Sequence, residues 1–185
     1  PPVVGPLAAA SPFVLHRTAG GLWVTDERSG ADYPIRLPVE PAWYSKKTAA
    51  GTEMSRVGVL QGTYLGIYVS NTCMYWYSKP EPLNCRFCTT GKNVGINEVA
   101  RKSVADVVET AKAARDESGA IFTHFTCGYA FEEDSARRNA HGLQQAAPYV
   151  EAVRREVGGF IGVQAVPVLK ADYDEYDQLI DLGVD

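Results

Sequence analysis

The sequence predicts an α/β fold in which strands alternate with helices, preceded by a short β-rich lead-in. Runs rich in β-branched and aromatic residues alternate with segments whose apolar residues recur at helical spacing. Glycines stand where such helices should end, at Gly119 and at Gly158-Gly159. With 185 residues and 45% hydrophobic composition, the chain is large enough to bury a substantial core. Alternating strands and helices imply parallel pairing through crossover connections.

Residues 1–56 predict an N-terminal extension, a small β meander rather than a domain of its own. They are rich in Pro, Gly, Ala and Ser, and turn signals at Gly20-Gly21 and Ser29-Gly30 separate their apolar runs. The three runs occupy residues 13–16, 22–25 and 33–37.

The pattern of residues 57–185 predicts that this segment forms the α/β core. Strands are expected at 57–61, 64–70, 120–125 and 160–166. Ser103, with Asp106 three residues later, predicts the start of a helix that runs to about Arg115. A second helix should place Ala146, Val150, Val153 and Val157 on one face, and a third should do the same with Tyr173, Tyr176, Leu179 and Ile180.

Charge and composition exclude several functions. The net charge of −4 and the isoelectric point near 5.4 leave no basic footprint for nucleic acid. The sequence has no apolar run long enough for a membrane span, and its first residues do not resemble a secretory signal. Four cysteines, three of them clustered, favour metal binding in a reducing compartment over a disulfide scaffold, so we expect a cytoplasmic protein.

The most informative stretch is 68–91, Y-V-S-N-T-C-M-Y-W-Y-S-K-P-E-P-L-N-C-R-F-C-T-T-G. It places Cys73, Cys85 and Cys88 directly after a predicted strand. Sulfur ligands select zinc, copper(I) or iron–sulfur clusters over hard cations. A structural zinc site is normally closed by four ligands, whereas a site with three protein ligands leaves a position for substrate.

At these residues the sequence resembles the radical S-adenosylmethionine (radical SAM) enzymes. In that family three cysteines hold a [4Fe–4S] cluster whose remaining iron binds S-adenosylmethionine, and the last two cysteines enclose two residues, the second usually aromatic. Here that pair is Cys85-Arg86-Phe87-Cys88, while eleven residues separate Cys73 from Cys85 in place of the common three. The run I-Y-V-S-N-T-C, residues 67–73, is similar to the biotin synthase and tyrosine lyase branch.

The resemblance implies a fold, a reaction and further site residues. Residues 57–185 would form the first half of a radical SAM partial TIM barrel, completed by more chain or by another molecule, with residues 162–185 as its third strand and helix. An electron from a donor such as flavodoxin or ferredoxin would cleave S-adenosylmethionine to a 5′-deoxyadenosyl radical, which would abstract hydrogen from a small-molecule or peptide substrate. The implied cofactor-binding residues are Phe87 against the adenine, Gly128 with its neighbours Cys127 and Tyr129, and Gln164.

Besides the radical SAM interpretation, two possibilities for the whole chain and the roles of two residues remain open on sequence grounds. The cysteines also suit a structural zinc closed by Cys127 or His124, in a binding or assembly module without radical chemistry. A third possibility keeps the barrel fold and loses the chemistry. Cys127 itself is a fourth ligand, a redox thiol or a small buried hydrophobe. The Gln164 side chain forms a hydrogen bond either with a ligand or with another group of the protein.

Overall fold

The computed structural model describes residues 10–69, 72–77, 79–129, 142–166 and 173–185. Ser70, where the second predicted strand ends, and the polar loop 130–141 lie outside these residues. The chain divides into two compact units, Pro1–Glu40 and Pro41–Asp185, which are described separately. The sequence placed the boundary after residue 56, whereas the segment 41–56 belongs to the larger unit because it packs on that unit's helix: the Trp43 indole donates to Ser118 Oγ, with 3.0 Å between Nε1 and Oγ.

The smaller unit contains a three-stranded antiparallel sheet, as the turn signals predict. The strands pair in the order β1-β2-β3, and Gly21 joins the first two with a φ of 122° that favours glycine. Their bounds are Phe13–Thr18 for β1, Gly21–Asp26 for β2 and Ala31–Ile35 for β3.

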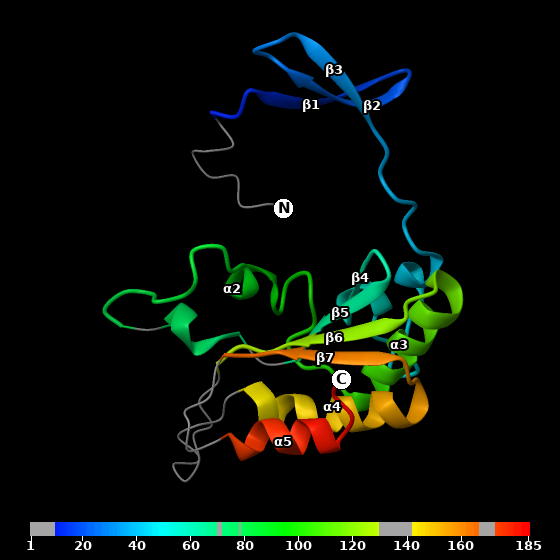
Figure 1. Cartoon of the computed structure of the whole chain (residues 1–185), viewed down its shortest axis with the longest axis vertical. Helices are drawn as coiled ribbons and strands as arrows, with labels where there is room; N and C mark the ends of the chain where they lie inside the picture. The colour runs from blue at the N-terminus through cyan, green and yellow to red at the C-terminus, as the bar shows by residue number, and fades with distance from the viewer. Residues whose placement is uncertain (1–9, 70–71, 78, 130–141, 167–172) are drawn as a thin grey trace. The chain divides into compact units, whose positions relative to one another are not determined.

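The larger unit is built on a four-stranded sheet in the order β4-β5-β6-β7 (Figure 1). β4 is antiparallel to β5, while β5, β6 and β7 are mutually parallel. The predicted α/β class and the parallel pairing are therefore confirmed. Across the described residues the sheet is open and does not close into a barrel. The bounds are Val59–Gln61 for β4, Tyr64–Tyr68 for β5, Phe122–Thr126 for β6 and Phe160–Gln164 for β7.

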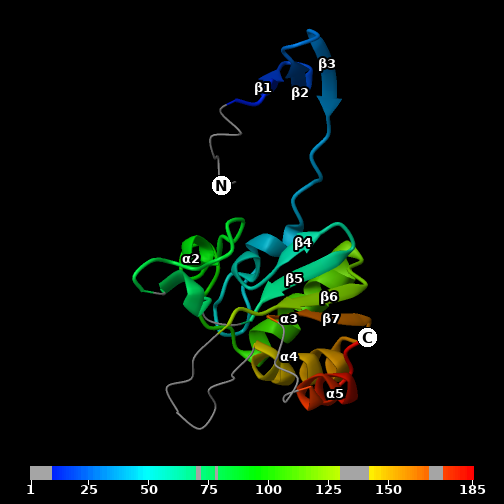
Figure 2. The same ribbon diagram turned by 60° about the vertical axis from the view of Figure 1, so that its left-hand side comes forward.

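Three helices cover one face of this sheet, as Figures 1 and 2 show for α3, α4 and α5. They span Val104–Ser118, Gly142–Glu156 and Asp174–Asp181. The short helix α2, Thr90–Asn93, and the 3₁₀ turns η1 (Ala42–Ser45), η2 (Met54–Arg56) and η3 (Met74–Tyr77) lie in connecting segments. Ser103 caps α3 as predicted, because its Oγ accepts from Asp106 N, and Gly119 ends the helix in the left-handed conformation.

The strands alternate between a helix-covered face and an open face. The helix-covered face supplies Leu65, Ile67, Phe125 and Ile161 to the core, each almost fully buried. The intervening positions, which include Tyr64, His124 and Gln164, belong to the open face, since side chains in a strand alternate between the two sides. Among the helices of the described residues, none is both long and apolar enough to cross a membrane.

Candidate metal and cofactor site at the carboxyl end of the sheet

Cys73 lies just beyond β5 and is attached to the end of β6. The backbone N–H of Met74 donates to Tyr129 O at 2.8 Å, and Val69 N donates to Thr126 O at 3.1 Å. These two bonds hold the start of the cysteine loop against the last residue of β6 and the segment that follows it. The fold thus brings Cys73 to the carboxyl edge of parallel strands, where sites in α/β folds usually assemble.

Gly128 is in close contact with Cys73 in this arrangement. A Cβ atom built on Gly128 would lie 2.8 Å from Cys73 Cβ and would overlap the Tyr68 hydroxyl. Only glycine permits so close an approach of the two backbones. The adjacent Tyr129 packs its ring on Tyr75, with centroids 5.6 Å apart. The predicted residues Cys73, Gly128 and Tyr129 are therefore neighbours.

Cys85 and Cys88 are joined by a tight turn, in which Cys88 N donates to Cys85 O at 3.0 Å. Cys85 is exposed, Cys88 is half-buried, and neither forms a disulfide. Phe87, between them, is 86% exposed and so leaves its ring available to a ligand. Among the described residues, no three histidine, cysteine, aspartate or glutamate side chains gather closely enough to hold a metal ion.

Cys88 has two polar side chains against its sulfur. The Trp76 indole N–H donates to Cys88 Sγ, with 3.3 Å between Nε1 and Sγ, and Thr90 Oγ1 lies 3.1 Å from the same sulfur. Burial raises the pKa of the Cys88 thiol, but hydrogen bonds from the Thr90 side chain, Trp76 and the Thr90 backbone outweigh burial. The net result is a pKa below the ordinary value, which favours the thiolate that binds metals.

Cys127 lies on the helix-covered side of the sheet, opposite the open face that carries His124 and Gln164. It continues the alternation of Thr123 and Phe125, is 6% exposed and belongs to the core under the helices. Burial raises the pKa of its thiol to about 12, so the group is protonated at neutral pH. Of the three roles open for Cys127, these surroundings favour the small buried hydrophobe.

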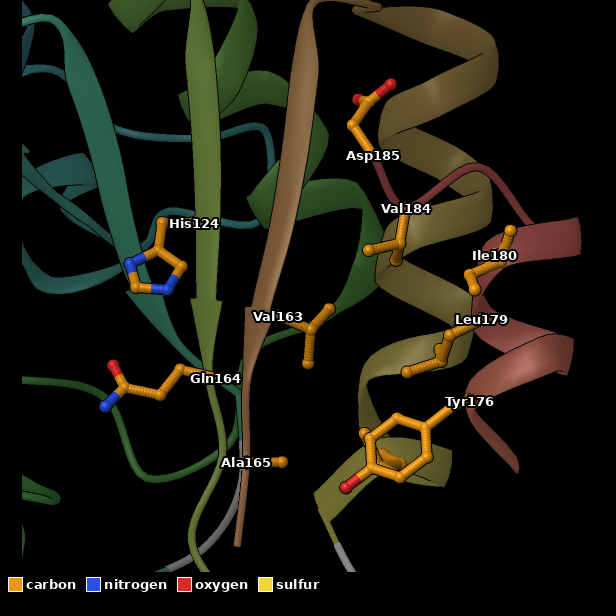
Figure 3. A pocket seen from close by; sticks show the side chains of 10 residues that line it. His124, Val163, Gln164, Ala165, Tyr176, Leu179, Ile180, Val184 and Asp185 are labelled. Atoms are coloured by element: carbon orange, nitrogen blue, oxygen red, sulfur yellow. The ribbon is translucent and has the colours of Figure 1, made fainter. Parts of the chain in front are cut away.

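Gln164 and His124 extend from the open face, on the side of β6 and β7 away from α4 and α5 (Figure 3). Val163 and Tyr176 in the same view lie on the helix side, and all four residues line one pocket of about 560 Å³. Gln164 is exposed, while its backbone carbonyl accepts from Cys127 N at 2.8 Å. Burial lowers the pKa of His124, which keeps its imidazole neutral at pH 7.

A second hollow, of about 190 Å³, joins this face to the cysteine loop. It is lined in part by polar side chains of Thr90, Asn93, Glu98, His124 and Thr126. Glu98 also forms an ion pair with Lys102, with 3.3 Å between Lys102 Nζ and Glu98 Oε2. Thr89, the residue directly after Cys88, also lines this hollow, so a molecule held there would lie beside the predicted metal ligands.

Sequence reasoning missed the roles of Trp76 and Thr90. Both residues belong to the stretch 68–91, in which the sequence indicated roles only for the three cysteines and Phe87. The one available signal was Gly91: a Cβ atom there would overlap the Trp76 ring. A glycine directly after two threonines marks a place where a bulky group can lie on the backbone.

Comparisons with known proteins returned no matching family model, no matching curated protein and no matching solved structure.

Proposed function

We propose that this chain is a radical SAM enzyme in which Cys73, Cys85 and Cys88 ligate a [4Fe–4S] cluster. The observation that carries the proposal is the contact between Cys73, after β5, and Gly128, after β6. The first cysteine of the motif lies beside the buried backbone of Gly128, at the carboxyl end of two parallel strands. That backbone is where the resemblance requires the methionine part of S-adenosylmethionine to bind.

The donor set fits an iron–sulfur cluster. All three thiols are free, and they belong to one loop at one edge of the sheet. The hydrogen bonds to Cys88 lower the pKa of its thiol below the ordinary value. Because no three ligands are gathered in the described residues, the proposal requires the exposed Cys85–Cys88 turn to close toward Cys73 as the cluster assembles.

The remaining residues have assigned roles in this proposal. The cluster, when bound, would supply the electron that cleaves the sulfonium of S-adenosylmethionine, and a flavodoxin- or ferredoxin-type donor would reduce the cluster. In this proposal the cofactor contacts the backbone at Gly128, as the resemblance implies, the exposed Phe87 ring lies against the adenine, and Gln164 supplies its amide on the open face. Cys127 and Tyr129 support this edge by packing rather than by ligation.

We further propose that β5, β6 and β7 form one wall of a partial TIM barrel. Parallel strands with helices on a single face match the wall of such a barrel, whose interior would be the open face with His124 and Gln164. Asp185 N donates to Ile161 O at 2.9 Å, where a next parallel strand would pair. Further strands are needed for closure and are part of the proposal.

Anaerobic reconstitution with iron and sulfide tests the ligand assignment. We expect about four irons per chain, with 5′-deoxyadenosine formed from S-adenosylmethionine under dithionite. Cys73→Ala, Cys85→Ala and Cys88→Ala should each lose the cluster and the cleavage. Cys127→Ala is the matched control, since its buried thiol faces the helices, and it should load iron like the wild type. One tightly bound zinc without cleavage would instead establish the zinc-stabilised binding module.

A further inference from the structure

Trp76 is held over the cysteine loop by the shape of the loop itself. The backbone N–H of Trp76 donates to Cys73 O at 3.0 Å, which fixes the residue in η3. Its six-membered ring lies on Gly91, where any Cβ atom would collide with it. The indole is therefore positioned from two sides, by the turn that follows the first cysteine and by the glycine that follows the third.

This position directs the indole N–H at a cysteine sulfur. Nε1 lies 3.3 Å from Cys88 Sγ, within the range of an N–H···S hydrogen bond, and Thr90 Oγ1 lies 3.1 Å from the same atom. Indole nitrogen is a donor only. A thiolate sulfur has no proton to give, so with an ionised Cys88 the Thr90 hydroxyl also donates. Both groups therefore direct a hydrogen atom with partial positive charge at this sulfur.

We propose that Trp76 and Thr90 are positioning residues that raise the reduction potential of the cluster through hydrogen bonds to Cys88 Sγ. The inference rests on the proposed function. An electron added to the cluster increases the negative charge on its sulfur ligands, and hydrogen-bond donors stabilise that charge. Donation by two side chains to one ligand makes Cys88 the ligand through which this loop controls how easily the cluster is reduced.

Two variants remove the donors while keeping shape. Trp76→Phe keeps a ring over Gly91 without an N–H, and Thr90→Val replaces the hydroxyl by a methyl group. After reconstitution, each should carry as much iron as the wild type and show a lower midpoint potential. The expected change is roughly tenfold in the reduction equilibrium, ~59 mV for one electron. Tyr77→Phe is the matched control: Tyr77 is the next aromatic residue in η3, and its 68% exposed side chain should leave the potential unchanged.

A second readout uses the full chain without metal. The sequence has three tryptophans, so an amide correlation spectrum contains three indole signals, of which Trp76→Phe assigns one. Cys88→Ala should shift the Trp76 indole signal, because the sulfur acceptor is lost. The Trp43 indole, which donates to Ser118 Oγ, should not move.

The two readouts separate the possible failures. A loaded wild-type cluster whose potential is unchanged in both Trp76→Phe and Thr90→Val overturns the inference and leaves the proposed function standing. A wild-type chain that binds no iron–sulfur cluster overturns both, even if Cys88→Ala still shifts the indole signal and so verifies the contact. A Trp76 signal insensitive to Cys88→Ala removes the hydrogen bond on which the inference depends.

Discussion

Gly128 shows how one missing side chain defines the candidate site. The residue is buried against Tyr68 and Cys73, two groups that follow or end the neighbouring strand β5. A side chain at this position would have to displace a tyrosine hydroxyl and the Cys73 Cβ atom together. The edge of the sheet is therefore closed by the Gly128 backbone packing directly against Cys73 and the Tyr68 hydroxyl.

We predict that Gly128→Ala weakens both the fold and the site. Overpacking of this kind costs about 1–3 kcal/mol, so urea denaturation of the metal-free chain should show the loss. The reconstituted protein should bind S-adenosylmethionine at least tenfold more weakly, measured by calorimetry. Gly20→Ala is the control, because a Cβ atom there meets only Thr18 Oγ1 at an ordinary 3.6 Å.

A double variant identifies the cause of that loss. Tyr68→Phe removes the hydroxyl that a Gly128 side chain would overlap. Combined with Gly128→Ala, it should recover part of the stability lost by Gly128→Ala alone, since the effects of contacting residues are not additive. If Gly128→Ala cost the same stability in the wild-type chain and in the Tyr68→Phe variant, the packing explanation would be contradicted.

Cys127 illustrates what a sequence leaves open at the level of one residue. A cysteine next to a glycine after a strand is compatible with all three roles, of which the small buried hydrophobe is the most common for a lone cysteine. The register of β6 favours the small buried hydrophobe, because Thr123, Phe125 and Cys127 share the helix-covered face. Strand alternation was available from the sequence, but which face the helices cover depends on the packing of α3 and α4, which are distant in the chain.

At the scale of elements, the amino end of α3 connects the segment 41–56 to the core. Asp106 accepts from the Ser103 hydroxyl at 2.8 Å and from the Thr48 hydroxyl, and it is 5% exposed. Thr48 Oγ1 in turn accepts from Thr52 N at 3.2 Å. Burial raises the pKa of the Asp106 carboxyl, but the hydrogen bonds from Thr48 and Ser103 outweigh burial, and the net pKa lies below the ordinary value of 3.8.

Asp106→Asn should therefore destabilise the chain in a pH-dependent way. A lowered folded-state pKa contributes stability above the unfolded-state pKa, and that contribution is lost as the pH falls through the folded-state value. We expect a loss of about 1–3 kcal/mol at pH 7, shrinking as the pH falls below about 3.8. Urea titrations at several pH values measure this. Asp116→Asn, an exposed position in the same helix, is the control; a pH-independent difference for Asp106→Asn would contradict the assigned interaction.

The elements themselves were largely predictable, whereas the geometry of the cysteine loop was not. Ser103, Gly119 and Gly158 mark helix ends through local chemistry that a sequence displays directly. The third helix was less well predicted: α5 buries Leu179, but Tyr173 and Ile180 are more than half exposed. The N–H···S bond from Trp76 depends on Gly91 and Cys88 folding back over η3. No periodicity encodes such a contact, because it joins irregular segments.

For the whole molecule, the main question is where the independent units divide. The sequence indicated residue 56 because the composition changes there. The structure gives Pro1–Glu40 and Pro41–Asp185. Residues 36–40 have no regular structure, and Leu37 and Val39 are 65% and 93% exposed. Around Arg56, by contrast, Met54 and Val57 are buried, and Arg56 Nη2 donates to Ile96 O at 3.2 Å.

Limited proteolysis distinguishes the two boundaries, since proteases cut where the backbone is exposed and held by few contacts. Trypsin should cut after Arg36 and leave the Arg56–Val57 bond intact, which mass spectrometry of the fragments determines. Arg36→Gln should abolish the cut. The fragment that begins at Leu37 should retain the unfolding midpoint and the iron loading of the whole chain, because Trp43, Thr48 and the candidate site all lie within it. Cleavage after Arg56, or loss of iron loading on removal of residues 1–36, would show that the site depends on the N-terminal sheet.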